Sequence, residues 1–66
     1  MSIKVIAYIL SEYDDSLQDY KPINPSNRDN TPFWWYSHTS ICQAFSRLEG
    51  RYPGILFRVL VVKTIS

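Results

Sequence analysis

Two stretches of this 66-residue chain are apolar at nearly every position and have the length of β-strands. They are Ile3–Leu10 and Ile55–Ile65. A strand with one face in water alternates apolar and polar residues, whereas a near-continuous apolar run is typical of a strand covered on both faces. The chain offers one amphipathic helix as a cover. We therefore expect a second copy of the chain, or another protein, to supply the missing layer.

The helix is predicted over Thr39–Gly50, where apolar residues recur at the spacing of one helical face: Ile41, Ala44, Phe45 and Leu48. Ser37 or Thr39 can cap its start by accepting a hydrogen bond from a free backbone N–H. Gly50 suits the left-handed position that ends many helices. The Tyr52–Gly54 sequence then predicts a tight turn in which glycine supplies a positive φ.

The segment between residues 13 and 32 holds three prolines and a run of turn-forming residues, which exclude a continuous helix. A short helical turn could form at Asp15–Tyr20. The aromatic run Phe33–Tyr36 has a high strand propensity. We expect a short strand there, with Phe33 and Trp35 on one face and Trp34 and Tyr36 on the other.

These elements predict a single small α+β domain over residues 1–66, a two-layer α/β arrangement in the order β–long loop–(short β)–α–β. One helix packs on one face of a two- to three-stranded sheet. The strands that flank the helix run parallel, with a right-handed crossover, if they share a sheet. We assign to the helix side the cleaner apolar set: Val5, Ala7, Ile9, Phe57, Val59 and Val61. The opposite apolar face is the predicted surface for a dimer or a partner: Ile6, Tyr8, Leu10, Leu56, Leu60 and Val62.

A domain of this size is marginally stable, and small domains often add disulfides, a metal or oligomerisation. The chain has one cysteine and one histidine, so we expect neither an internal disulfide nor a four-ligand zinc site. Oligomerisation remains, as a homodimer or as a complex with another protein. No apolar run has the length of a membrane span or of a signal sequence. With its free thiol, the chain is expected to be a complete small cytoplasmic protein.

The net charge of +1 does not favour binding to nucleic acid or to an anionic membrane. The acidic residues are nevertheless concentrated between positions 12 and 19. We predict that Asp14, Asp15 and Asp19 engage a basic groove on a partner protein, because charge complementarity steers docking. Solvated loop carboxylates are the alternative.

The aromatic run supplies the second set of predicted partner-binding residues: Trp34, Trp35 and Tyr36. Exposed Trp and Tyr are enriched among the residues that dominate binding energy at protein interfaces. Two alternatives stay open. The rings could pack in the core, or they could stack on nucleotide bases as in single-strand-binding proteins.

No motif in the sequence indicates an enzyme, a metal site or a cofactor. His38 and Cys42 stand four residues apart and could share a helix face, but no third residue at a recognisable spacing would orient the histidine. A core cysteine beside a solvated histidine is the simpler interpretation. Arg47 and Arg51 could clamp a phosphate, or could lie solvated on the helix surface.

The sequence therefore predicts a small non-enzymatic protein-binding module, an inhibitor or adaptor that acts by occluding a partner protein. Its size, layout and lack of catalytic groups resemble those of very small phage-encoded proteins that bind and disable one host enzyme. This resemblance is one of architecture alone. The alternative function is a small nucleotide- or single-stranded nucleic-acid-binding protein that uses Phe33–Tyr36 as a stacking platform.

Overall fold

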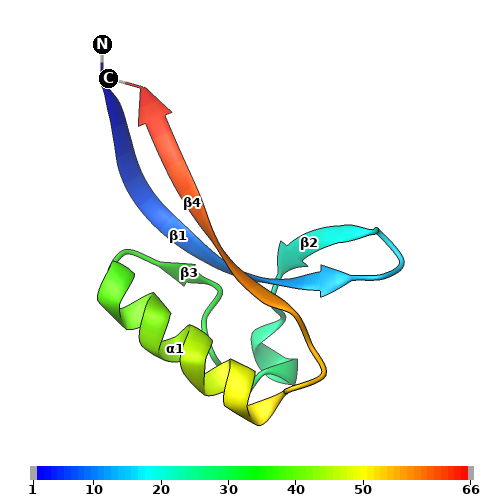
Figure 1. The fold of residues 1–66 in the computed structure, drawn as a ribbon. Coiled ribbons are helices and arrows are strands. Elements are labelled where there is room, and N and C mark those ends of the chain that lie inside the picture. Colours follow the sequence, from blue (N-terminus) through cyan, green and yellow to red (C-terminus); the bar gives the residue numbers. More distant parts are fainter. Residues whose placement is uncertain (1, 66) are drawn as a thin grey trace.

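The computed structural model describes residues 2–65, which form one helix packed against a four-stranded antiparallel sheet (Figure 1). The predicted α+β class is confirmed. The elements in chain order are strand β1 (Ile3–Asp14), strand β2 (Asp19–Pro22), the 3-10 helix η1 (Pro25–Asn27), strand β3 (Trp34–Trp35), helix α1 (His38–Arg51) and strand β4 (Phe57–Ile65). The sheet has four strands where we predicted two or three, because the connecting segment contains β2.

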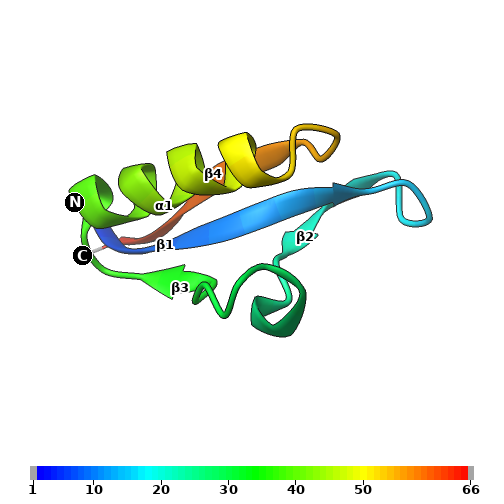
Figure 2. The same cartoon turned by 90° about the horizontal axis from the view of Figure 1, so that it is seen from below.

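Strand β1 is the centre of the sheet and pairs with every other strand. Tyr8 and Ile9 pair with β3 on one side and with β4 on the other, and Ser11 and Glu12 pair with both β2 and β4. Because a strand has two edges, β2 and β3 must share the edge of β1 that β4 leaves open, as Figure 2 shows. The strands that flank α1 are β3 and β4. They run in the same direction, since both are antiparallel to β1, but β1 separates them.

An extra residue in β1 changes which side chains face the helix. Val5 lies opposite Lys63 and Ala7 lies opposite Val62, so Ile6 is inserted without a partner of its own. Side chains alternate between the two faces of a regular strand, and an inserted residue reverses that alternation beyond it. This β-bulge is why our assignment of β1 side chains to the two faces is partly wrong.

Beyond the bulge, Tyr8 and Leu10 lie on the helix side of the sheet, not on the opposite side as predicted. Leu10 is fully buried in the core, and Tyr8 packs against that core. Ala7 and Ile9, which we had assigned to the helix side, lie on the opposite side of the sheet together with the β4 residues that they pair with. We call this side the far face. The strand β4 is regular, and the prediction that Phe57 faces the helix is confirmed.

The core lies between α1 and the β1–β4 pair. Its buried apolar side chains are Leu10, Ile23, Ile41, Ala44, Leu48 and Phe57, and Phe45 and Val59 pack against them. The predicted apolar stripe of the helix is therefore confirmed. Val61 lies on the helix side but is 44% exposed, because β1 and β4 continue past the helix as a two-stranded ribbon that carries both termini (Figure 1).

The helix begins one residue before the predicted Thr39 and ends one residue after the predicted Gly50. The Ser37 side chain caps the start by accepting a hydrogen bond from the Ser40 N–H (3.2 Å). Gly50 lies inside the helix, so the predicted glycine cap is wrong. The predicted tight turn after Tyr52 forms, but Gly54 does not take the positive φ that we expected there. Tyr52 caps the end instead: its N–H donates to the Leu48 carbonyl (2.8 Å), and its own carbonyl accepts from Ile55 (3.0 Å).

The segment between β1 and β3 is ordered by local turn chemistry. Residues 15–18 close a hairpin between β1 and β2, in place of the helical turn that we considered for Asp15–Tyr20. Gln18 takes a positive φ in this hairpin, as do Asp29 and Asn30 in the loop after η1. Aspartate and asparagine tolerate the left-handed region better than most residues. The loop after η1 can therefore fold back toward the helix without glycine.

Candidate partner-binding surface

The aromatic run is divided between the two faces of the sheet, as the strand alternation predicted. Trp35 lies opposite Tyr8 and packs against the core, and its indole N–H donates to the Pro32 carbonyl (2.6 Å). Trp34 lies opposite Ile9 and is therefore on the far face. Trp35 is consequently a core residue and not a partner-binding residue as predicted. Of the three rings proposed for partner binding, it is the one for which the alternative of core packing is correct.

Trp34 and Tyr36 form an exposed aromatic pair on the far face. Their ring centroids are 6.2 Å apart in an edge-to-face arrangement. Trp34 is 39% exposed and Tyr36 is 78% exposed. Edge-to-face geometry is a favourable packing mode for two aromatic rings, so the pair presents a preorganised apolar surface to solvent.

Apolar residues of β1 and β4 continue this surface. Ile9 lies opposite both Trp34 and Leu60, and Ala7 lies opposite Val62, so these side chains share the far face. Ile9, Leu60 and Val62 are half-buried. Leu60 and Val62 thus lie where the sequence placed them. Of the other residues predicted for this surface, Ile6 is exposed at the bulge and Leu56 is 64% exposed in the loop before β4.

The three predicted acidic residues lie on the β1–β2 hairpin, at the other end of the molecule from the termini (Figure 1). The Asp14 carboxylate accepts hydrogen bonds from the Ser16 and Leu17 N–H groups (2.8 and 3.2 Å) and forms an ion pair with Lys21 (2.6 Å). Bonding to Lys21 holds the pKa of Asp14 below its usual value and raises the pKa of Lys21.

The three carboxylates therefore have different surroundings in the structure. Asp14 closes the hairpin turn and is neutralised by Lys21. Asp19 accepts a hydrogen bond from the N–H of Tyr20 (2.7 Å). Asp15 is exposed and lines a shallow open cavity of about 330 Å³ with Glu12, Arg28 and the Ile55–Leu56 segment. The buried Glu12 in that cavity already forms an ion pair with Arg28, so its charge is satisfied within the chain.

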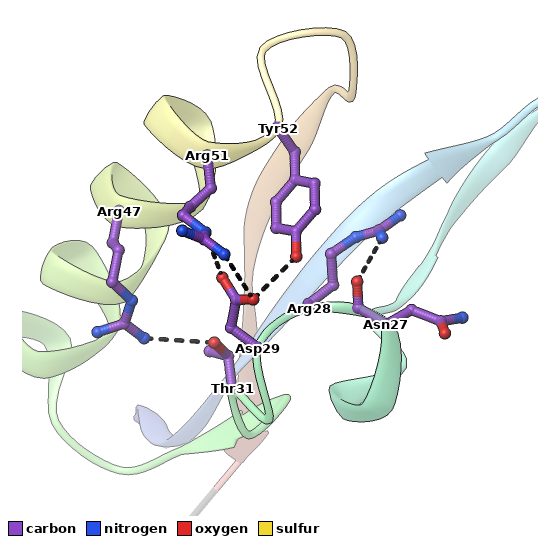
Figure 3. Close-up of polar contacts among 7 residues, drawn as sticks. All are labelled: Asn27, Arg28, Asp29, Thr31, Arg47, Arg51 and Tyr52. Atoms are coloured by element: carbon purple, nitrogen blue, oxygen red, sulfur yellow. Dashed lines mark hydrogen bonds and ion pairs between the residues drawn. The ribbon is translucent and has the colours of Figure 1, made fainter.

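Arg47 and Arg51 bind the chain's own loop rather than standing free on the helix surface (Figure 3). The Arg51 guanidinium donates to both Asp29 carboxylate oxygens (2.7 and 3.2 Å), and the Tyr52 hydroxyl donates to the same carboxylate (3.1 Å). Arg47 donates to the Thr31 hydroxyl (3.3 Å). These long-range contacts tie the loop after η1 to the helix, and sequence reasoning missed them.

His38 and Cys42 are neighbours on the first turns of α1. The Cys42 sulfur lies 3.6 Å from Nε2 and 3.8 Å from Nδ1 of His38, and the imidazole also contacts the Tyr8 ring (5.4 Å between centroids). The Cys42 side chain packs against the core. This arrangement fits the interpretation of a packed cysteine beside an exposed histidine.

Among residues 2–65, no three histidine, cysteine, aspartate or glutamate side chains are grouped so that they could hold a metal ion. In the same part of the chain, no helix has the length and apolar character that crossing a membrane requires. Comparison of the chain with protein-family models, with curated proteins and with solved structures finds no match.

Proposed function

We propose that this chain is a small non-enzymatic protein-binding module, an inhibitor or adaptor that occludes a partner protein with the far face of its sheet. The observation that carries the proposal is the exposed Trp34–Tyr36 pair beside the apolar side chains of Ile9, Leu60 and Val62. Monomeric proteins rarely expose a large contiguous apolar patch, and such a patch with aromatic anchors is typical of a protein interface.

A nucleotide- or single-stranded nucleic-acid-binding function is the second candidate, because Trp34 and Tyr36 are exposed and could stack on bases. The charges favour it less. Lys21, Arg28 and Arg51 are ion-paired within the chain, and Arg58 lies over the Tyr20 ring (4.5 Å to its centroid). Phosphate-driven binding needs cations free to contact the nucleic-acid backbone.

Affinity capture with matched variants tests the proposed function. The wild-type chain, Tyr36→Ala and Leu17→Ala are immobilised and exposed to cell lysate, and bound proteins are identified by mass spectrometry. Leu17 is an exposed apolar residue of the distant β1–β2 hairpin and serves as the control. We expect a partner that the wild type and Leu17→Ala retain and that Tyr36→Ala loses. Equal recovery by all three variants contradicts the far-face site.

Tryptophan fluorescence separates the two candidate functions. A single-stranded oligonucleotide should leave the emission of the chain unchanged if the far face binds protein. Quenching that weakens as salt is added would instead indicate base stacking with a phosphate contribution, and would favour the nucleic-acid function.

A further inference from the structure

We propose that two copies of this chain associate through the open edge of β4, with the two β4 strands antiparallel and related by a two-fold axis at Val61. This dimer goes beyond the proposed function, because it uses the edge of the sheet and leaves the far face to another partner. The evidence comes from the hydrogen-bonding direction of β4, its length, and the position of the helix.

The backbone contacts of Leu10 show which way the β4 backbone groups point. The Leu10 N–H donates to Phe33 (2.8 Å) and the Leu10 carbonyl accepts from Ile23 (3.0 Å), so both groups point away from β4. Leu10 lies opposite Val59, and this is therefore a pair without mutual hydrogen bonds. In an antiparallel ladder, the N–H and C=O of Val59 must then point toward the open edge.

The same direction repeats along the whole strand. The Tyr13 N–H donates to the Leu56 carbonyl (2.9 Å), so the backbone groups of even-numbered residues in this part of the chain point toward β1. β4 has no bulge that would interrupt this alternation. The residues whose backbone groups point outward are Phe57, Val59, Val61, Lys63 and Ile65. Within residues 2–65, no strand pairs with this edge.

The open edge of β4 lacks most of the features that prevent strands from pairing. Natural edge strands are short, or carry proline, a bulge or several charges. β4 has nine residues and no proline, and its only charged side chains are Arg58 and Lys63. The opposite edge of the sheet is protected, because β3 has two residues and β2 has four and ends at Pro22.

A second copy fits this edge in register. Two-fold antiparallel pairing keeps each face continuous, so a residue can lie opposite only residues of its own face. Arg58 and Lys63 lie on different faces and therefore cannot oppose each other. Val61 is the middle residue of β4, and an axis there pairs all nine residues. Arg58 then lies opposite Thr64, and Lys63 lies opposite Val59.

This pairing also covers the part of the ribbon that the helix leaves bare. α1 lies over the β4 side of the sheet (Figure 2). Antiparallel pairing places the Ile65 end of one copy beside the Phe57 end of the other, where that copy's helix covers the same face. Ile65 is 65% exposed and Val61 is 44% exposed in the single chain, so dimerisation buries the β4 part of the apolar surface that lacks a cover.

Sedimentation equilibrium of three chains tests the dimer. We expect the wild type to pass from 7.7 kDa to twice that mass with increasing concentration. Val61→Glu puts two like charges opposite each other at the axis and should weaken the dimer at least about tenfold. Leu17→Glu changes an exposed apolar residue of the β1–β2 hairpin, outside β4, and should dimerise like the wild type. Circular dichroism confirms that each variant is folded.

A gain-of-function variant keeps the test decisive if Val61→Glu does not fold. Thr64→Glu places a carboxylate opposite Arg58 of the second copy, twice in each dimer, and should tighten association several-fold. A wild type that stays at 7.7 kDa up to millimolar concentration, an assembly larger than a dimer, or no change with either β4 variant overturns the proposal. Because these variants leave Trp34 and Tyr36 intact, loss of the dimer and loss of partner capture are separate outcomes.

Discussion

At the scale of single residues, Asp29 is the polar side chain on which the loop after η1 depends. It has a positive φ, and its carboxylate accepts hydrogen bonds from Arg51 and Tyr52 at the end of the helix. The bond from Arg51 holds the pKa of Asp29 below its usual value of 3.8. A carboxyl group whose pKa is lowered by folding stabilises the fold above its unfolded pKa, and this contribution is lost as the pH falls through the folded pKa.

Replacement of Asp29 tests this role. Asp29→Asn should lower the Tm at neutral pH, because the ion pair with Arg51 is lost. It should also reduce the fall in Tm as the pH drops below about 4, because one carboxyl group with a lowered pKa has been removed. Asp15→Asn, at an exposed position of the hairpin, is the control. Thermal unfolding curves for Asp29→Asn and wild type that differ equally at every pH would contradict the linkage to Asp29.

At the scale of elements, the sequence predicted the helix from the period of its apolar residues and the two long strands from their near-continuous apolar runs, because both signals are local. The Ile6 bulge was not predictable from the same pattern. Residues 3–10 are apolar on both faces, so a reversal of the alternation leaves no polar residue in the core to reveal it. Tyr8 and Leu10 were placed on the wrong face for this reason, and only the register with β4 corrects it.

Strand β2 and the candidate surface also depend on contacts that a local sequence pattern cannot predict. β2 is short and polar, and it forms because Asp14 closes a turn and Lys21 pairs with that carboxylate. Its register depends on contacts that no local pattern contains. The division of the aromatic run was predictable, since alternation alone puts Trp34 and Trp35 on different faces. Which of these two rings faces the helix was not predictable, because it depends on how the whole sheet packs.

Truncation of Leu10 tests the reversed alternation. Leu10→Ala should lower the free energy of unfolding by about 2–5 kcal/mol, because it removes a fully buried side chain and leaves a cavity. Leu56→Ala, at an exposed leucine that the sequence placed on the same face as Leu10, should change stability by less than about 0.5 kcal/mol. Chemical denaturation measures both. Equal effects of the two substitutions would contradict the β-bulge.

At the scale of the whole molecule, the fold has a covered half and a bare half. The half beneath α1 encloses the core, whereas the end of the ribbon near the termini has no helix over it (Figure 1). An isolated two-stranded ribbon is marginally stable in water. The shortage of covering layers that the sequence predicted therefore falls at one end of the β1–β4 pair, and dimerisation through β4 would relieve it.

Hydrogen exchange in the Val61→Glu chain measures this difference without the second copy. Ile9 and Leu60 form a hydrogen-bonded pair under the covered half, and Lys4 and Thr64 form an equivalent pair near the termini. The amides of Lys4 and Thr64 should exchange at least about tenfold faster, because local opening there exposes little buried surface. In the wild type at high concentration, the outward amide of Val61 should become protected from exchange, and the amides of Lys4 and Thr64 should exchange more slowly than in the variant. Equal protection of the two pairs in the monomeric variant would show that the ribbon needs no cover, and would remove the physical reason for a dimer.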